Sequence, residues 1–186
     1  MKRIIKTVPF TIPFAKKGNY YRAGNSAEIS TGWSPAIGRM YSQVMCFGED
    51  ITIDQLAISI YTAAAAGGVA RMGLYADDGT LHPGQLIYDS GEIDTTTTGP
   101  KTATPPSPIV IAKGTPFWTC FLCGVAAPKP KSSDVACLSA LGVDNIAVSW
   151  SRSGFYAWGA YGPLPAIHPA GMFLRGLYDY VHIRLA

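Results

Sequence analysis

The stretch that decides the fold is Ile51-Thr52-Ile53-Asp54-Gln55-Leu56-Ala57-Ile58-Ser59-Ile60-Tyr61. Within it, Leu56, Ile58 and Ile60 alternate with smaller or polar residues. Alternation with a period of two places these three side chains on one face of an extended chain. The stretch therefore predicts a β-strand that is buried on one face only.

Further strands are predicted on both sides of this one, at a spacing typical of an all-β domain. They are residues 40–47, 69–75, 85–88, 91–93, 109–111, 115–123, 147–150 and 178–185, with a Thr-rich exposed edge at 95–98. The last run alternates, so we expect the C-terminus to pair back into a sheet. Because no crossover helix separates the strands, the pattern predicts an all-β fold, either an antiparallel β-sandwich or a jelly roll.

Turn signals separate these runs. Gly (20) and Pro (14) are spread along the chain, and Asp77-Asp78-Gly79 has the composition of a tight turn. Residues 63–66 are all alanine and could seed a short helix, but two strand signals flank them, so a tight loop is expected. Residues 19–38 are expected to form loops or short edge strands, and residues 128–133 a surface loop.

Residues 1–38 are predicted to form an extended N-terminal arm with an irregular lead-in, and residues 39–186 the sandwich domain. Within residues 1–18 apolar and basic side chains alternate, and no acid precedes Glu28. A basic arm on a mildly acidic body is typical of docking onto an acidic surface or nucleic acid, whereas a solvated tail is the alternative. The expected partner contacts are Lys2, Arg3, Ile5, Lys6, Val8, Phe10, Ile12, Phe14, Lys16 and Lys17.

Composition also points to an assembly. Charged residues make up 15% of the chain and hydrophobic residues 48%, against a usual charged share of about 25%. So low a share of charged residues suggests that other protein covers part of the surface. No segment approaches the ~20 apolar residues of a membrane-spanning helix, and the first residues lack the apolar core of a secretion signal. We therefore expect no membrane span, and synthesis in a cytoplasm.

The cysteines and histidines favour structural roles over catalytic or metal-binding ones. Cys120 and Cys123 have CxxC spacing but lie in an apolar strand, which directs their thiols to opposite faces. Buried free thiols are expected, with a zinc site or a disulfide such as Cys46–Cys137 as the alternatives. The three histidines, which have no neighbouring acid at metal-ligand spacing, are expected to be structural or surface residues. They are His82, His168 and His182.

No catalytic set emerges from the acidic residues or from short motifs. The pairs Glu49-Asp50 and Asp77-Asp78 lie in predicted loops, where carboxylates most often solvate a turn or accept from its backbone N–H groups. Calcium at the Asp77-Asp78-Gly79 turn is the alternative. Neither a hydrolase elbow nor a phosphate-binding glycine loop occurs. The sequence thus predicts a protein that is not an enzyme and holds no cofactor and no metal.

Aromatic residues gather near the C-terminal third of the chain, among three glycines. They are Trp150, Phe155, Tyr156, Trp158 and Tyr161. Exposed aromatic side chains on glycine-rich loops stack on sugar rings or bury themselves in a partner protein. Three interpretations stay open: these residues close one end of the sandwich, contact a protein partner, or bind a glycan.

The stretch from Ile53 to Gly124 resembles a β-sandwich module of tailed-phage virion proteins, including tail-fibre, head-fibre and decoration components. The residues that carry the likeness are Ile58 to Gly79, Pro83-Gly84-Gln-Leu, Asp89-Ser-Gly91, Thr95 to Gly99 and Gly114-Thr-Pro-Phe-Trp118. The family has no shared catalytic residues. The chain lacks long fibrous repeats, so it looks more like a decoration protein, a head-fibre base or an adaptor than a full tail fibre.

Together these features predict a structural component of a phage virion, assembled in the host cytoplasm and anchored by its arm. The expected partners are other virion proteins and further copies of the chain, with a trimer as one arrangement, whereas nucleic acid is not expected. A tail-associated module that binds a host receptor or carbohydrate is the alternative. A hydrolase would need a cleft with paired acids, for which the sequence offers no candidate residues.

Overall fold

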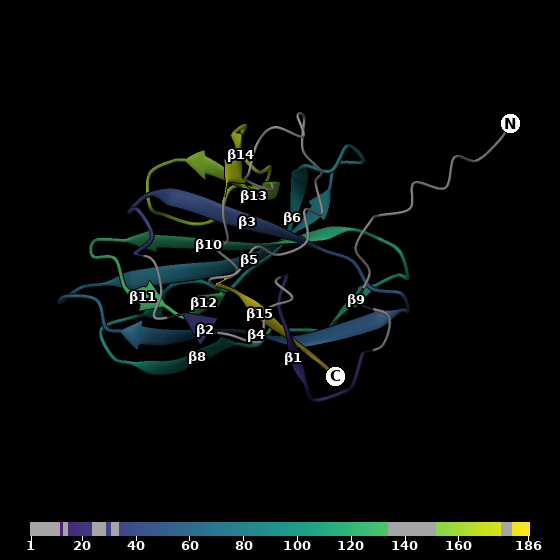
Figure 1. Ribbon diagram of the computed structural model, residues 1–186, viewed down its shortest axis with the longest axis horizontal. Helices are drawn as coiled ribbons and strands as arrows, with labels where there is room; N and C mark the ends of the chain where they lie inside the picture. The colour runs from purple at the N-terminus through teal and green to yellow at the C-terminus, as the bar shows by residue number, and fades with distance from the viewer. Residues whose placement is uncertain (1–11, 13–14, 24–28, 31–33, 134–151, 176–179) are drawn as a thin grey trace, which may run out of the picture.

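The computed structural model describes residues 12, 15–23, 29–30, 34–133, 152–175 and 180–186 (Figure 1). Within these residues the protein is all-β, as predicted, and two antiparallel sheets pack face to face as a β-sandwich. Residues 63–66 lie outside regular structure, which confirms the loop predicted there. The pairing establishes a sandwich without singling out a jelly roll. The described part of the chain contains no helix that could cross a membrane.

The first sheet is built around β4 (Ile51–Thr62), the long alternating strand. On one side of it lie β15 (His182–Leu185) and β11 (Lys129–Pro130), and on the other β8 (Gly99–Ala103) and β9 (Ile109–Ile111). The strand β1 (Tyr20–Tyr21) pairs with β15 at the edge. The C-terminal strand therefore does pair back into a sheet. The inward side chains of β4 are buried, and they are Ile51, Ile53, Leu56, Ile58 and Ile60.

The second sheet contains the remaining long strands. Their order is β14 (Met172–Arg175), β13 (Arg152–Trp158), β3 (Arg39–Met45), β10 (Phe117–Gly124), β5 (Val69–Asp77) and β6 (Pro83–Asp89), and β7 (Ile93–Asp94) also pairs with β5. A separate two-stranded ladder joins β2 (Ile29–Ser30) to β12 (Ser132–Ser133). Figure 1 shows this sheet above the first one.

The main core fills the space between the two sheets. Its members come from both of them and include Ile53, Leu56 and Ile58 of the first sheet, and Met72, Phe117 and Phe121 of the second. A second cluster covers the opposite, outward face of the second sheet: Met40, Val44, Tyr75, Trp118, Cys120, Leu122, Phe155 and Leu164. Every residue of β10 is consequently buried, which explains its uninterrupted apolar sequence.

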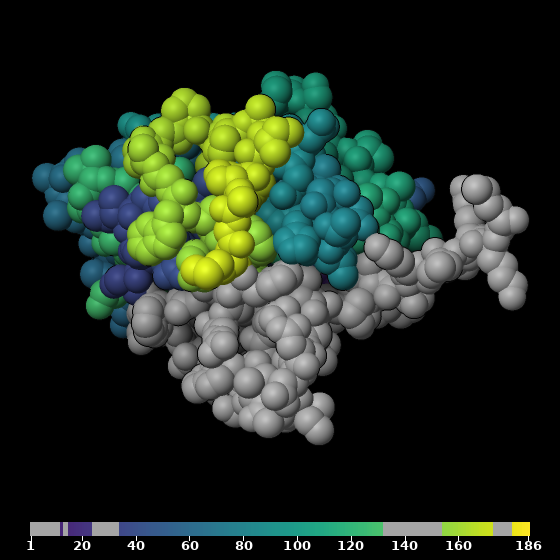
Figure 2. Space-filling view, turned by 90° about the horizontal axis from the view of Figure 1, so that it is seen from above, coloured from purple at the N-terminus to yellow at the C-terminus, as the bar shows by residue number. Residues whose placement is uncertain are grey.

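The segment that covers this outward face is residues 159–171, which we call the strap. It crosses from β13 towards β6, where the Leu86 amide donates to the Ala166 carbonyl and the His168 amide to the Gly84 carbonyl, both at 2.8 Å. Figure 2 looks onto this face, and the yellow-green residues that follow β13 lie against the teal residues of β6. The strap therefore gives the second sheet a second buried side.

Two local predictions were wrong. The Thr-rich segment 95–98 is a bend between β7 and β8, and Thr95 is fully buried because its backbone exchanges hydrogen bonds with the loop at Ala64 and Gly68. Asp94 accepts from the amide and hydroxyl of Thr96, which ends the strand. Residues 128–133 contain the short strands β11 and β12 instead of lying wholly in a loop.

Candidate interaction sites

The root of the N-terminal arm is part of the sandwich. The Ile12 amide donates to the Cys46 carbonyl and the Gly48 amide to the Ile12 carbonyl, both at 3.0 Å, which forms a parallel bridge to Phe47. The Ile12 side chain packs half-buried against the main core. This corrects the prediction for Ile12, which contacts its own domain instead of a partner.

The residues that follow Ile12 are also attached to the sandwich. The Ala15 amide donates to Glu49 Oε1 at 2.6 Å, and the Gly18 amide donates to the Leu185 carbonyl at 2.7 Å. Lys16 and Lys17 are exposed, so both remain available to a partner. The other predicted contacts, Lys2, Arg3, Ile5, Lys6, Val8, Phe10 and Phe14, lie outside the described residues.

The acidic pair Glu49-Asp50 fastens backbone segments at this root. Glu49 accepts from Ala15, and Asp50 Oδ1 accepts from the Lys113 amide at 2.7 Å. A pocket of about 420 Å³ lies beside the pair and is also lined by Lys17. The second acidic pair acts in the same way, because both Asp77 and Asp78 accept from backbone amides of their own turn. Their role is to satisfy N–H groups, as the first interpretation had it.

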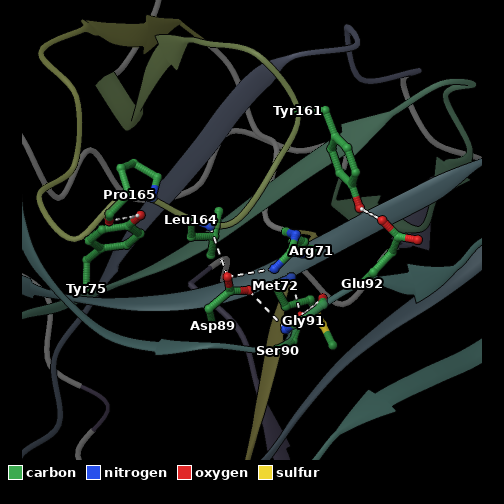
Figure 3. Close-up of polar contacts among 10 residues, drawn as sticks. All are labelled: Arg71, Met72, Tyr75, Asp89, Ser90, Gly91, Glu92, Tyr161, Leu164 and Pro165. Atoms are coloured by element: carbon green, nitrogen blue, oxygen red, sulfur yellow. Dashed lines mark hydrogen bonds and ion pairs between the residues drawn. The ribbon is translucent and has the colours of Figure 1, made fainter.

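The strap is held by a carboxylate at the end of β6, an edge strand of the second sheet (Figure 3). Asp89, the last residue of β6, accepts from Arg71 at 2.7 Å, from the Leu164 amide at 2.9 Å and from the Gly91 amide at 3.0 Å. Its pair with Arg71 is largely shielded, since the two side chains are 19% and 14% exposed. Asp89 thus ties β5, β6 and the strap together.

Two tyrosines add contacts between the strap and the sheet. Tyr75 donates its hydroxyl to the Pro165 carbonyl at 3.0 Å, and Tyr161 approaches Glu92 at 3.4 Å (Figure 3). Burial and the nearby Glu92 carboxylate raise the pKa of Tyr161 to about 12, so its hydroxyl keeps the proton that it donates. Tyr161 consequently serves to position the strap.

A serine and a histidine meet beneath the strap. Ser42 Oγ lies 2.9 Å from His168 Nε2, and His168 Nδ1 lies 2.9 Å from the Pro169 carbonyl. Because a carbonyl only accepts, Nδ1 carries the hydrogen and Nε2 accepts from Ser42. Burial lowers the pKa of His168 and favours this neutral form.

The Ser42–His168 contact resembles the nucleophile and base of a hydrolase in composition only. Ser42 is 0% exposed and His168 6%, so a substrate would have no access to the hydroxyl. The contact instead holds the strap to β3. Among the described residues no group of three or more His, Cys, Asp or Glu side chains could hold a metal ion.

The cysteines behave as predicted where the structure describes them. Cys120 belongs to the outward cluster and Cys123 to the main core, which confirms that the CxxC thiols point to opposite faces. Burial raises the pKa of each to about 12, so both stay protonated and unreactive at neutral pH. Cys46 is also free and buried, whereas Cys137 lies outside the described residues.

The aromatic residues are divided by the pleat of a strand. Residues 155–158 belong to β13 and not to a loop as predicted, so consecutive side chains point to opposite faces. Phe155 is buried in the outward cluster and has no surface to offer a ligand, which corrects its assignment as a candidate contact. Tyr161 lies on the strap, and Trp150 lies outside the described residues.

Tyr156 and Trp158 remain together on one face and meet an arginine that the sequence did not single out. The guanidinium carbon of Arg39 lies 3.5 Å from the ring centre of Tyr156, 5.1 Å from that of Trp158 and 5.3 Å from that of Tyr41. Trp158 is 60% exposed. No local signal marks Arg39, because strand pairing alone brings β3 beside β13.

No protein-family model matches the chain. No curated protein matches its sequence significantly either.

Proposed function

We propose that the protein is a non-enzymatic structural component of a phage virion, a capsid decoration, head-fibre or adaptor protein anchored by its basic arm. The observation that carries this proposal is the construction of the arm root. Backbone hydrogen bonds at Ile12 and Gly18 join the arm to the sandwich. A partner that binds the arm would therefore hold the folded domain in place as well.

The chemistry of residues 1–11 supports docking onto an acidic protein surface. Lys2, Arg3 and Lys6 supply positive charge, while Ile5, Val8 and Phe10 supply apolar contacts. Such a segment can add a strand to the edge of a neighbouring sheet, where backbone hydrogen bonds provide affinity and the charges provide orientation. Other virion proteins and further copies of the chain are the proposed partners.

Deleting residues 1–11 should leave the unfolding temperature unchanged but remove the protein from particles. Because the loss of only ~1.4 kcal/mol weakens binding about tenfold, we expect at least about tenfold fewer copies per purified particle by quantitative mass spectrometry. The matched control is deletion of residues 1–18, which also removes Ile12 and Gly18 and should lower the unfolding temperature as well. Normal incorporation of the shorter deletion would overturn the proposal.

A tail-associated module that binds a host carbohydrate is the second candidate. The exposed indole of Trp158, next to the cation of Arg39, supports it, since aromatic faces stack on sugar rings. On a glycan array Trp158→Ala should bind about tenfold less than the unaltered protein, which corresponds to ~1.4 kcal/mol. Tyr61→Ala, at a comparably exposed aromatic on the first sheet, is the control. Equal binding by both variants would exclude this candidate.

A further inference from the structure

The aromatic side chains around Arg39 are arranged by the register between β3 and β13. Trp158 is the Cα partner of Arg39, and Tyr156 is the partner of Tyr41. Directly opposed residues of an antiparallel pair project from the same face, so the four side chains form two neighbouring cross-strand pairs. The guanidinium therefore lies among three rings on the ladder between β3 and β13.

The positive charge of Arg39 is not matched within the described part of the chain. None of the ion pairs found there involves Arg39, and its Nε is buried without a hydrogen-bond partner. Aromatic faces attract a cation but do not accept the in-plane hydrogen bonds that a guanidinium offers. Because Nε has no contact with solvent, it is the charge of the half-buried Arg39 and the donors of its two terminal nitrogens that remain for an anionic group from outside.

Two glycines hold this cation next to the exposed indole. The Gly159 amide donates to the Gly38 carbonyl at 2.8 Å, so the residues adjoining Arg39 and Trp158 are joined through their backbones. A Cβ at Gly38 would lie 2.6 Å from the Gly159 carbonyl oxygen, and Gly38 has a φ of 72°. Only glycine allows this approach without strain. The pair is thus positioned before any ligand binds.

We propose that Arg39, Tyr156 and Trp158 form a binding site for an anionic saccharide. One sugar ring stacks on the exposed face of Trp158, and the carboxylate or sulfate that the sugar carries accepts from the guanidinium of Arg39. The inference rests on the second candidate function and names its class of ligand. An indole beside a single cation matches the size of one charged sugar residue, whereas a protein partner would cover about 800 Å² on each side.

The test titrates the full-length protein with three matched oligosaccharides and follows tryptophan fluorescence and heat. The probes are a glucuronic acid oligomer, a glucose oligomer of the same length and linkage, and the sulfated form of that glucose oligomer. We expect at least one anionic probe to bind about tenfold more tightly than the neutral one, the usual effect of a charge-assisted hydrogen bond. The stronger anionic probe shows whether a carboxylate or a sulfate is the natural group.

Substitutions separate the inference from the function on which it rests. Arg39→Gln should abolish the preference for the anionic probes and leave weak binding of the neutral one, while Arg39→Lys should keep part of the preference because it retains the charge. Trp158→Ala should weaken all three probes alike. Thermal unfolding of each variant shows whether the fold is kept, and Arg39→Lys preserves the test if Arg39→Gln does not fold.

The outcomes against the inference differ from one another. If all three probes bind equally, or if Arg39→Gln keeps the preference, Arg39 does not bind the anionic group of the sugar. The protein would then still be a saccharide-binding module, without a preference set by Arg39. If no probe binds, both the inference and the carbohydrate function fail. If Arg39→Gln instead reduces incorporation into particles while saccharide binding is absent, the ligand is an acidic protein partner and the inference is overturned.

Discussion

Asp89→Ala is expected to lower the free energy of unfolding by about 3 kcal/mol, the lower end of what breaking a shielded ion pair costs. The carboxylate of Asp89 accepts from Arg71 and from the amides of Gly91 and Leu164. Its removal leaves a cation that is only 14% exposed without its partner, and two amides without acceptors. Urea unfolding monitored by circular dichroism measures the change.

Asp54→Ala is the matched control for this prediction. Asp54 also pairs with an arginine, Arg184, through two hydrogen bonds of 2.9 and 3.0 Å, but this pair lies on the outer face of the first sheet and is more exposed. We expect a loss below about 1 kcal/mol there, because water solvates the arginine that is left. Equal effects of the two substitutions would show that Asp89 does not hold the strap in the way proposed.

Trp118→Ala is expected to be the most destabilising single substitution considered, with a loss of about 3–5 kcal/mol of unfolding free energy. Trp118 is fully buried in the outward cluster, and its indole N–H donates to Asp77 at 3.0 Å. The substitution leaves a cavity beneath the strap and an unused acceptor on Asp77. Guanidinium unfolding followed by circular dichroism should show the midpoint falling to a much lower denaturant concentration.

Two variants define what the Trp118 result means. Trp158→Ala makes the same chemical change at a residue that is 60% exposed, and we expect a loss within about 0.5 kcal/mol. Trp118→Phe keeps a buried aromatic ring but removes the hydrogen bond to Asp77 and part of the packed volume, so its loss should lie between those of Trp158→Ala and Trp118→Ala. A change below 1 kcal/mol for Trp118→Ala would mean that the outward cluster is not a second core.

Much of the fold was predictable because its strands carry their own patterns. Alternation identified β4, and an uninterrupted apolar run identified β10, including the division of Cys120 and Cys123 between two faces. Thr95–Thr98 shows the limit of such patterns. Threonines suit an exposed strand, but here Asp94 ends the strand and the loop at Ala64 buries Thr95, and both effects depend on neighbours that a propensity does not include.

The candidate sites were less predictable, because each joins residues that are distant in the chain. Ser42 meets His168 across 126 positions, and Arg39 meets Tyr156 only through the pairing of β3 with β13. The sequence did include Tyr156 and Trp158 among five candidate contact residues. It also grouped Phe155 with them, because a strand could not be recognised in this glycine-rich stretch. Without the strand, nothing indicated that Phe155 faces the opposite side of the sheet.

By itself the sequence determined the all-β class, the long alternating strand at residues 51–61 and the burial of its apolar face, because side-chain alternation along a strand is a local property of the backbone. Only the tertiary structure decided that Ile12 belongs to the sandwich, that the strap buries a second face, and that Arg39 lies beside Trp158 without an ion-pair partner among the described residues. These features depend on which strands become neighbours and in which register. The pairing and register that form are those that minimise the free energy of the whole core. They cannot be derived from the sequence of any single segment.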